Sequence, residues 1–151
     1  MPSVVCLSGY PGVGKTTRRK TMGGVQFDIA DIYDEYEDIQ PMHAFGELMT
    51  RMIEALRVGE PLIVLEAMFA RGSFQRATVE TLCSIYGAEC SYIELFEKDE
   101  VCIQRIILQY KESPRSPKDT RRFLARLRMF ERVVQPGLLA QAAGIAEEPK
   151  N

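Results

Sequence analysis

The residues of this chain with the clearest capacity for chemistry lie in one short run, from Gly9 to Thr16, with the sequence GYPGVGKT. The run matches the pattern G-x-x-x-x-G-K-[ST] at every fixed position. The glycines let the backbone curl so that successive N–H groups point at phosphate oxygens. Lys15 can then reach the β- and γ-phosphates, and the Thr16 hydroxyl can bind Mg²⁺. The run therefore predicts a nucleoside triphosphate site; the alternative is a glycine-rich turn that matches by chance.

The segments on either side of this run are those that a phosphate-binding loop requires. Residues 3–8 are short, apolar and β-branched, as in a buried strand. A helix is expected from about residue 14 to residue 22, where Gly23 and Gly24 end it. Because the loop joins a strand to a helix in the order that the motif demands, we favour the nucleotide site over the chance match.

The remainder of the chain continues this alternation of strands and helices. Short apolar runs predict strands at residues 25–29, 62–65 and 91–96. Apolar residues three or four positions apart predict helices at residues 41–58, 73–86, 99–112 and 117–135, the last three capped by Ser73, Asp99 and Ser116. The apolar face of the last helix holds Phe123, Leu124, Leu127, Phe130 and Val134. The alternation predicts a three-layer α/β/α fold with a parallel sheet of four to five strands, the fifth at residues 144–148.

Composition and charge exclude several classes of protein. A chain of 151 residues, 46% hydrophobic and 26% charged, is expected to form one globular domain over residues 1–151. It holds no apolar run near the ~18 residues of a membrane span and no signal-peptide pattern, so we expect a cytoplasmic protein with no membrane partner. Four cysteines without a CxxC pair and a single histidine argue against a zinc site. The cysteines are expected to be small buried side chains rather than disulfide partners.

The sequence also narrows the class of nucleotide-binding protein. A small GTPase requires an N-K-x-D motif, which is absent, and motor or AAA-type ATPases require a longer chain. The remaining class is a compact kinase, in which an acid follows the second strand and arginines come late in the chain. Here six carboxylates lie between Asp28 and Asp38, and nine Lys or Arg residues lie between Arg105 and Arg132.

Four segments, in their order, resemble the P-loop kinases related to 5′-hydroxyl polynucleotide kinase and zeta toxin. They are GYPGVGKTT at residues 9–17, FDIADIY at 27–33, PLIVLEAMF at 61–69 with Arg76 after it, and the late basic segment. The resemblance covers residues 4–136. It implies the P-loop kinase fold, with strand order 2-3-1-4-5 and a helical lid at about 105–132. It also implies ATP and Mg²⁺ as cofactors, with the γ-phosphate of ATP transferred to a hydroxyl acceptor. The implied nucleotide-binding residues are Gly9, Gly12, Val13, Gly14, Lys15, Thr16, Thr17 and, from the lid, Arg105.

The resemblance assigns roles to two acidic residues. Asp31 matches the general base, a carboxylate that accepts the proton of the acceptor hydroxyl. Asp28 and Asp34 are its rivals, and Asp31 can instead belong to a solvated acidic face or cap a helix. Glu66, directly after the third strand, matches an acid that orients the acceptor or holds a magnesium-bound water. The alternative for Glu66 is a carboxylate that only caps the next turn.

Basic residues complete the implied site. Arg71 and Arg76 follow the third strand as acceptor-binding candidates, of which Arg76 is the better candidate for a surface ion pair. Arg115 is assigned to clamp phosphates with its planar fork, and Lys111 and Arg122 are its substitutes. The catalytic set is therefore Lys15, Asp31 and Arg115.

The acceptor stays open. Nucleic-acid kinases of this family carry an arginine three residues after the catalytic aspartate, where this chain has Asp34. A carboxylate there repels a nucleic-acid phosphate, although a basic lid can still attract a strand. The acceptor is then either the 5′ end of a nucleic acid or a small alcohol, such as a nucleoside, a nucleotide or a metabolite. A third interpretation is a non-catalytic module that binds ATP as a regulatory ligand.

Overall fold

The computed structural model describes residues 1–131 and 136–149, and the chain forms two compact units. The first unit comprises residues 1–9 and 14–95, and the second comprises residues 10–13 and 96–151. Arg132 of the basic segment and Val134 of the predicted apolar face lie outside the described residues.

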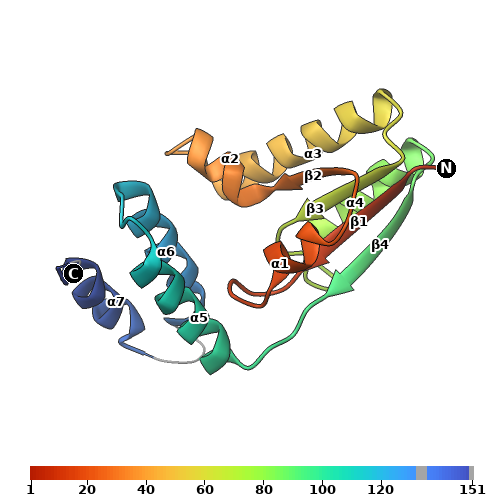
Figure 1. Ribbon diagram of the computed structural model, residues 1–151. Helices are drawn as coiled ribbons and strands as arrows, with labels where there is room; N and C mark the ends of the chain where they lie inside the picture. The colour runs from red at the N-terminus through yellow and green to blue at the C-terminus, as the bar shows by residue number, and fades with distance from the viewer. Residues whose placement is uncertain (132–135, 150–151) are drawn as a thin grey trace. The chain divides into compact units, whose positions relative to one another are not determined.

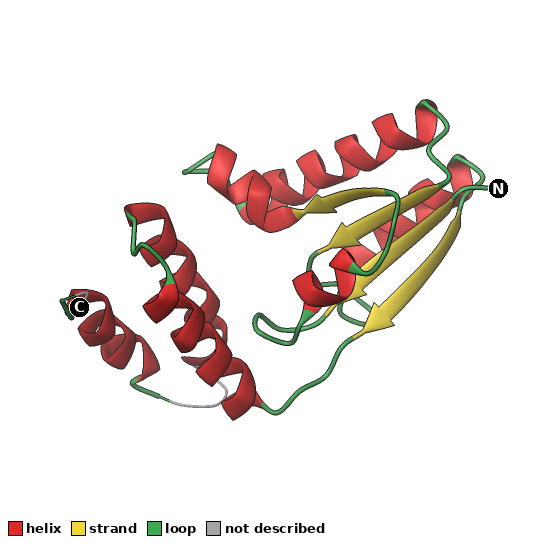
Figure 2. Ribbon diagram, in the orientation of Figure 1, coloured by secondary structure: helices red, strands yellow, loops and turns green. Residues whose placement is uncertain are grey.

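The first unit is built on a parallel sheet. Its strands are β1 (Ser3–Ser8), β2 (Val25–Asp28), β3 (Leu62–Glu66) and β4 (Glu89–Glu94). All neighbouring pairs are parallel and the order is β2-β3-β1-β4, as the arrows of Figure 2 show. The four strands thus have the order that the resemblance implies for them.

Four helices connect these strands and cover both faces of the sheet. They are α1 (Lys15–Lys20), α2 (Ile29–Glu35), α3 (Pro41–Arg57) and α4 (Phe74–Ile85). Helices α3 and α4 pack together over the face that holds Val4, Cys6, Ile63 and Leu65. Helix α1 lies on the other face, against β1 and β3 (Figure 1). This arrangement confirms the α/β class and is compatible with three layers.

Successive side chains of β3 point to opposite faces of the sheet, so their order determines which residues lie on each face. Ile63 and Leu65 join the apolar core under α3, while Glu66, one position later, belongs to the face of α1. The core side is continuous because the buried residues of α3 recur every three or four positions. They are Ala44, Phe45, Leu48, Met49, Met52, Ala55 and Leu56.

The second unit is helical. It contains α5 (Asp99–Glu112), α6 (Pro117–Glu131) and α7 (Leu138–Glu147), with α6 in contact with both others. The rings of Tyr110 and Phe123 stack with centroids 4.1 Å apart and join α5 to α6. The predicted lid at 105–132 corresponds to the later part of α5 and to α6.

The predicted cap of α6 is confirmed. Ser116 Oγ accepts from the backbone N–H of Asp119 at 3.1 Å, and Asp119 Oδ2 accepts from the N–H of Ser116 at 3.0 Å. This reciprocal pair satisfies two backbone donors that the first turn of a helix leaves without partners. It fixes the start of α6 at Pro117, whose missing N–H costs nothing in the first turn.

Three expectations about the elements are wrong. Residues 144–148 do not form a fifth strand, because the Leu- and Ala-rich segment forms α7 and buries Leu138, Ala142 and Ile145 on one face. The predicted strand at 91–96 begins two residues earlier, where Glu89 pairs with Ser3 at the start of β1. Asp99 is not the N-cap residue: Lys98 occupies that position, without a side-chain capping hydrogen bond, and Asp99 lies in the first turn.

The described helices and cysteines bear on two further expectations. No helix in the described ranges is long and apolar enough to cross a membrane. All four cysteines are free thiols; Cys6, Cys83 and Cys102 are buried and Cys90 is half-buried. The expectation of small buried side chains is thereby confirmed for three of them.

Candidate functional site

A charged residue stands at the carboxyl end of β3, inside the first unit. Glu66 is the last residue of this strand and is only 5% exposed. The strand register places it beside Leu7 of β1 and Asp28 of β2. These strand ends form the edge of the sheet from which the chain enters the glycine-rich run, residues 9–16. Ligands of parallel α/β proteins bind at such edges.

Thr16 connects the glycine-rich run to this carboxylate. Its hydroxyl donates a hydrogen bond of 3.0 Å to Glu66 Oε1. Thr16 is exposed, whereas Glu66 is buried, so the hydroxyl lies at the boundary between the solvent and the buried charge. The structure thus brings together two residues that the sequence assigned separately, one to the metal and one to the acceptor.

Arg19 is the cation of this cluster, and the sequence analysis did not single it out. Its Nε lies 3.0 Å from Glu66 Oε2, and its Nη2 lies 3.9 Å from Asp28 Oδ2. A signal was present, because Arg19 follows Thr16 by three positions and residues three apart share one face of a helix. The sequence alone did not show that both carboxylates would meet that face.

Burial dominates the electrostatics of Glu66. Desolvation raises the pKa of its carboxyl, and the neighbouring charge of Asp28 raises the pKa further. Arg19, the Thr16 hydrogen bond and Lys15 act in the opposite direction, in that order of size. The net shift is upward, so burial and the charge of Asp28 outweigh the nearby cations.

The backbone at Gly14, near the end of the glycine-rich run, has a conformation that glycine favours. Gly14, which precedes α1, has φ of 104°, a conformation that side chains rarely adopt. The Lys15 ammonium donates to the carbonyl oxygen of Gly9 at 2.6 Å. Lys15 therefore turns back along the run instead of pointing away from it. Thr17, the last predicted nucleotide contact, is exposed on α1.

The two aspartates of residues 28–31 occupy different places. Asp28 ends β2, beside Glu66, and caps α2 by accepting from the N–H of Ala30 at 2.9 Å. Asp31 lies in the first turn of α2 and is exposed. The geometry therefore groups Asp28 with Thr16 and Glu66, and places the predicted base, Asp31, three residues further along.

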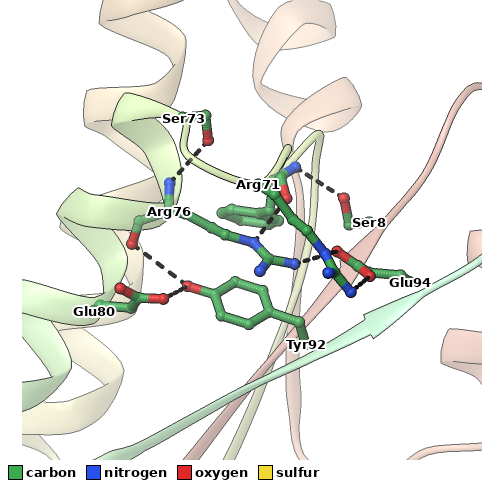
Figure 3. Close-up of polar contacts among 8 residues, drawn as sticks. Ser8, Arg71, Ser73, Arg76, Glu80, Tyr92 and Glu94 are labelled. Carbon is green, nitrogen blue, oxygen red and sulfur yellow. Dashed lines mark hydrogen bonds and ion pairs between the residues drawn. The ribbon is translucent and has the colours of Figure 1, made fainter.

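A second charged cluster lies at the end of β4, an edge strand of the same sheet (Figure 3). Glu94 is the last residue of β4 and forms ion pairs with both Arg71 and Arg76. Arg71 donates from Nε and Nη2 at 3.3 and 3.0 Å, and its side chain is 81% exposed. The hydrogen bond from Arg71 is the largest cause of the lowered pKa of Glu94.

Arg76 has a different environment from Arg71. Its guanidinium lies over the ring of Tyr92, 3.7 Å from the centroid, and its Nε donates to the carbonyl oxygen of Phe69 at 3.0 Å. The expected ion pair of Arg76 is present, but its side chain is only 17% exposed rather than on the surface. Phe69 N–H donates to the buried Ser8 hydroxyl at 3.0 Å. The loop after β3 is therefore fastened at Phe69 from two sides.

The second unit holds the other predicted site residues. Gly12 has φ of 81°, and a Cβ there would lie 2.7 Å from the carbonyl oxygen of Cys102, so only glycine fits. Arg105 donates to the carbonyl oxygen of Gly12 at 3.2 Å. Val13 is buried and its N–H donates to the carbonyl of Tyr10 at 3.3 Å.

The predicted clamp, Arg115, also lies in the second unit. Its Nη1 donates to the carbonyl oxygen of Glu148 at 2.8 Å, and its guanidinium lies 5.6 Å from the centroid of Tyr110. Its φ of 55° places it in the left-handed region, between α5 and α6. Arg115 is therefore engaged with its own unit, while Lys111 is exposed at the end of α5.

Neither metal-ligand geometry nor known sequences identify the site further. The described part of the chain has no group of three or more His, Cys, Asp or Glu side chains arranged to hold a metal ion. No protein-family model matches the chain, and a search of curated proteins finds no match either.

Proposed function

We propose that this protein is an ATP-dependent phosphotransferase that transfers the γ-phosphate to a hydroxyl group. One observation carries the proposal: Thr16, the last residue of the G-x-x-x-x-G-K-[ST] run, is hydrogen-bonded to Glu66, a buried carboxylate at the carboxyl end of a central parallel strand. A run that matched the pattern by chance would not require an ionisable residue at that place. The resemblance to small P-loop kinases supports the same conclusion.

The donor set suits Mg²⁺. A threonine hydroxyl and carboxylate oxygens are hard oxygen ligands, and Mg²⁺ keeps several waters when it is held by few protein groups. Thr16 would bind the ion directly and Glu66 would hold one of its waters. When bound, the ion neutralises charge on the β- and γ-phosphates. The raised pKa of Glu66 is consistent with this role, because burial and the charge of Asp28 outweigh Arg19 and Lys15, so that a further cation would stabilise the carboxylate.

Lys15 is proposed to contact the β- and γ-phosphates. Its ammonium already lies over the run, bonded to the Gly9 carbonyl, and would exchange this contact for phosphate oxygens. Phosphoryl transfer needs little covalent chemistry from the protein, so positioning and charge neutralisation supply most of the rate. The roles of Arg105 and Arg115 as phosphate contacts stay predictions from the resemblance.

The general base is proposed to be Asp31, with Asp28 as its rival. Asp31 is exposed, so its carboxylate is accessible to an acceptor that approaches from solvent. Asp28 lies closer to the Glu66 cluster, but one of its oxygens caps α2 and Arg19 lies beside the other. Those contacts favour a structural role for Asp28.

For the acceptor we rank the 5′-hydroxyl end of a nucleic acid above a small alcohol. The resemblance favours the nucleic acid, and Arg71 is an exposed arginine near the strand ends that can exchange Glu94 for a phosphate. The acidic segment from Asp28 to Asp38 favours a small alcohol, because it repels a polyanion.

The test is a transfer assay with γ-labelled ATP. The acceptors are 5′-OH RNA, 5′-OH DNA, nucleosides, nucleoside monophosphates and sugar alcohols, each at two salt concentrations. Transfer to oligonucleotides that falls steeply with salt supports the nucleic-acid acceptor. Transfer to a neutral small molecule at both salt concentrations supports the alcohol.

Two lysine variants control this assay. Lys15→Ala should abolish turnover, whereas Lys20→Ala, an exposed lysine on the same helix, should leave it unchanged. ATP that is bound but transferred to no acceptor would support the regulatory module instead. Equal ATP affinity of wild type and Lys15→Ala by calorimetry would contradict the nucleotide site.

A further inference from the structure

Arg19 occupies a position between two carboxylates that belong to different strands. Its guanidinium lies 3.0 Å from Glu66 at its Nε and 3.9 Å from Asp28 at its Nη2. The three side chains are 18%, 7% and 14% exposed for Arg19, Glu66 and Asp28, so solvent screens them weakly. The carbonyl oxygen of Arg19 accepts from the Gln26 side chain at 3.0 Å, which attaches this end of α1 to the start of β2.

The register explains why a cation is needed there. Asp28 and Glu66 are directly paired across β2 and β3, so their backbones are fixed at neighbouring positions. Two carboxylates that share a poorly solvated place repel each other unless a cation lies between them. Carboxylate oxygens at such spacing are also the ligands that Mg²⁺ and Mn²⁺ prefer. A guanidinium supplies one positive charge at that place and, as part of the chain, does not dissociate.

We propose that Arg19 is a positioning residue that takes the place of a divalent ion between Asp28 and Glu66. Arg19 holds Glu66 at Thr16, while the paired carboxylates themselves bind no free metal. Divalent ions are then recruited through the Thr16 hydroxyl together with the nucleotide phosphates. This last step rests on the proposed function; the exclusion of a free metal by Arg19 does not.

The experiment measures Mn²⁺ binding without nucleotide, by the loss of the free-ion signal in electron paramagnetic resonance. The variants are Arg19→Met and Arg19→Lys, with Arg18→Met as the matched control, since Arg18 is an exposed arginine next to it on α1. Wild type, Arg18→Met and Arg19→Lys should bind Mn²⁺ only weakly. Arg19→Met should bind one ion at least about tenfold more tightly, with Kd on the order of 1 mM or below, because the two carboxylates are left without their cation.

A double variant tests whether the new ion lies at the expected place. Arg19→Met combined with Glu66→Gln should lose the added Mn²⁺ binding. Thermal unfolding should agree: Mn²⁺ should raise the midpoint of Arg19→Met and leave that of wild type unchanged. Wild type that binds Mn²⁺ as tightly as Arg19→Met, or Arg19→Met that binds no more than Arg18→Met, would overturn the proposal.

Two further outcomes keep the test decisive. If Arg19→Met does not fold without metal, recovery of folding in the double variant supports the role of Arg19 as counter-ion to Glu66, and failure to recover contradicts it. All of these measurements omit ATP. Failure of the proposed function would instead appear as absence of Mg-ATP binding by the wild type in calorimetry, so the two failures are distinguishable.

Discussion

Glu66 and Glu94 are the last residues of β3 and β4, the two strands that flank β1, and both form ion pairs with arginine. Their surroundings nevertheless shift the pKa values of the two carboxyl groups in opposite directions. Burial and Asp28 raise the pKa of Glu66, while Arg71 lowers that of Glu94. Glu66 has one arginine, which it shares with a second carboxylate. Glu94 has two arginines to itself. Ion pairs at two strand ends of the same sheet can therefore have very different electrostatic surroundings.

This difference distinguishes a candidate binding site at Glu66 from a structural ion-pair cluster at Glu94. The cluster at Glu66 is short of positive charge and ends at an exposed hydroxyl, which suits a ligand that brings a cation. The cluster at Glu94 has two arginines for one carboxylate, and Arg76 is further held by Tyr92 and Phe69. It fixes the loop after β3 in place.

Among the acidic residues, the largest expected effect is at Asp31. Asp31→Asn should lower the rate of phosphoryl transfer by about 10²–10⁴-fold, because the amide cannot accept the hydroxyl proton, and should leave ATP affinity unchanged. Single-turnover transfer and calorimetry measure the two quantities. If Asp28→Asn shows the loss and Asp31→Asn does not, the base is Asp28 and the cluster extends to the reacting hydroxyl.

The comparison is tested most directly by one substitution made at both glutamates. Glu66→Gln should lower kcat by about 10–100-fold, because the amide can still accept from Thr16 but no longer carries the charge that holds a magnesium-bound water. Glu94→Gln should change kcat by about twofold at most. Steady-state kinetics at saturating Mg²⁺ give both numbers. Equal losses of kcat would remove the distinction between a binding site at Glu66 and a structural cluster at Glu94.

A smaller effect is expected when the two arginines of Glu94 are compared. Arg76→Met should lower the free energy of unfolding by about 1–2 kcal/mol, since it loses the face of Tyr92 and the Phe69 carbonyl. Arg71→Met should unfold at the same denaturant concentration as wild type, because its pair is exposed to solvent. Chemical unfolding of the two variants in parallel is the measurement. A larger loss for Arg71→Met would contradict this assignment.

The smallest expected effect is a difference in pH dependence. Glu66, with its raised pKa, contributes stability that is complete below its unfolded pKa, ordinarily 4.5, and is lost as the pH rises through the folded value. Glu94, with its lowered pKa, contributes stability that is present above 4.5 and is lost as the pH falls through the folded value.

Unfolding in EDTA between about pH 3 and pH 7 tests these signs, since the contribution of Glu94 is lost below pH 4.5 and that of Glu66 above it. As the pH rises, Glu66→Gln should gain stability relative to wild type and Glu94→Gln should lose it. Parallel curves for both variants would show that the two glutamates do not differ in this way.

Much of the fold could be predicted from local pattern. The apolar runs of β1 and β3 and the break at Ser116 are determined by residues close in sequence, and each was found. The fifth strand was wrong because an apolar segment of Leu and Ala fits a helix as well as a strand, and only the face formed by Leu138, Ala142 and Ile145 decides between them.

The sequence analysis singled out the residues of the candidate site that a local pattern identifies. Thr16 and Glu66 were both found, the first by the pattern of the run and the second by its place after a buried strand. Arg19 was not, because its two partners come from β2 and β3 and meet it only once the strands are in register. Arg76 likewise depends on Tyr92, a residue of a different strand.

The strand register has a consequence for how the chain tolerates changes in length. Removing one residue from the middle of β3 would move Glu66 into the position of Leu65, on the face of α3, and would place Ala67 opposite Thr16, because successive side chains of a strand point to opposite faces. Added residues in the turn at Gly59 and Glu60, before β3 begins, would leave that pairing intact. The chain should therefore tolerate insertions and deletions in the turn but not in the strand.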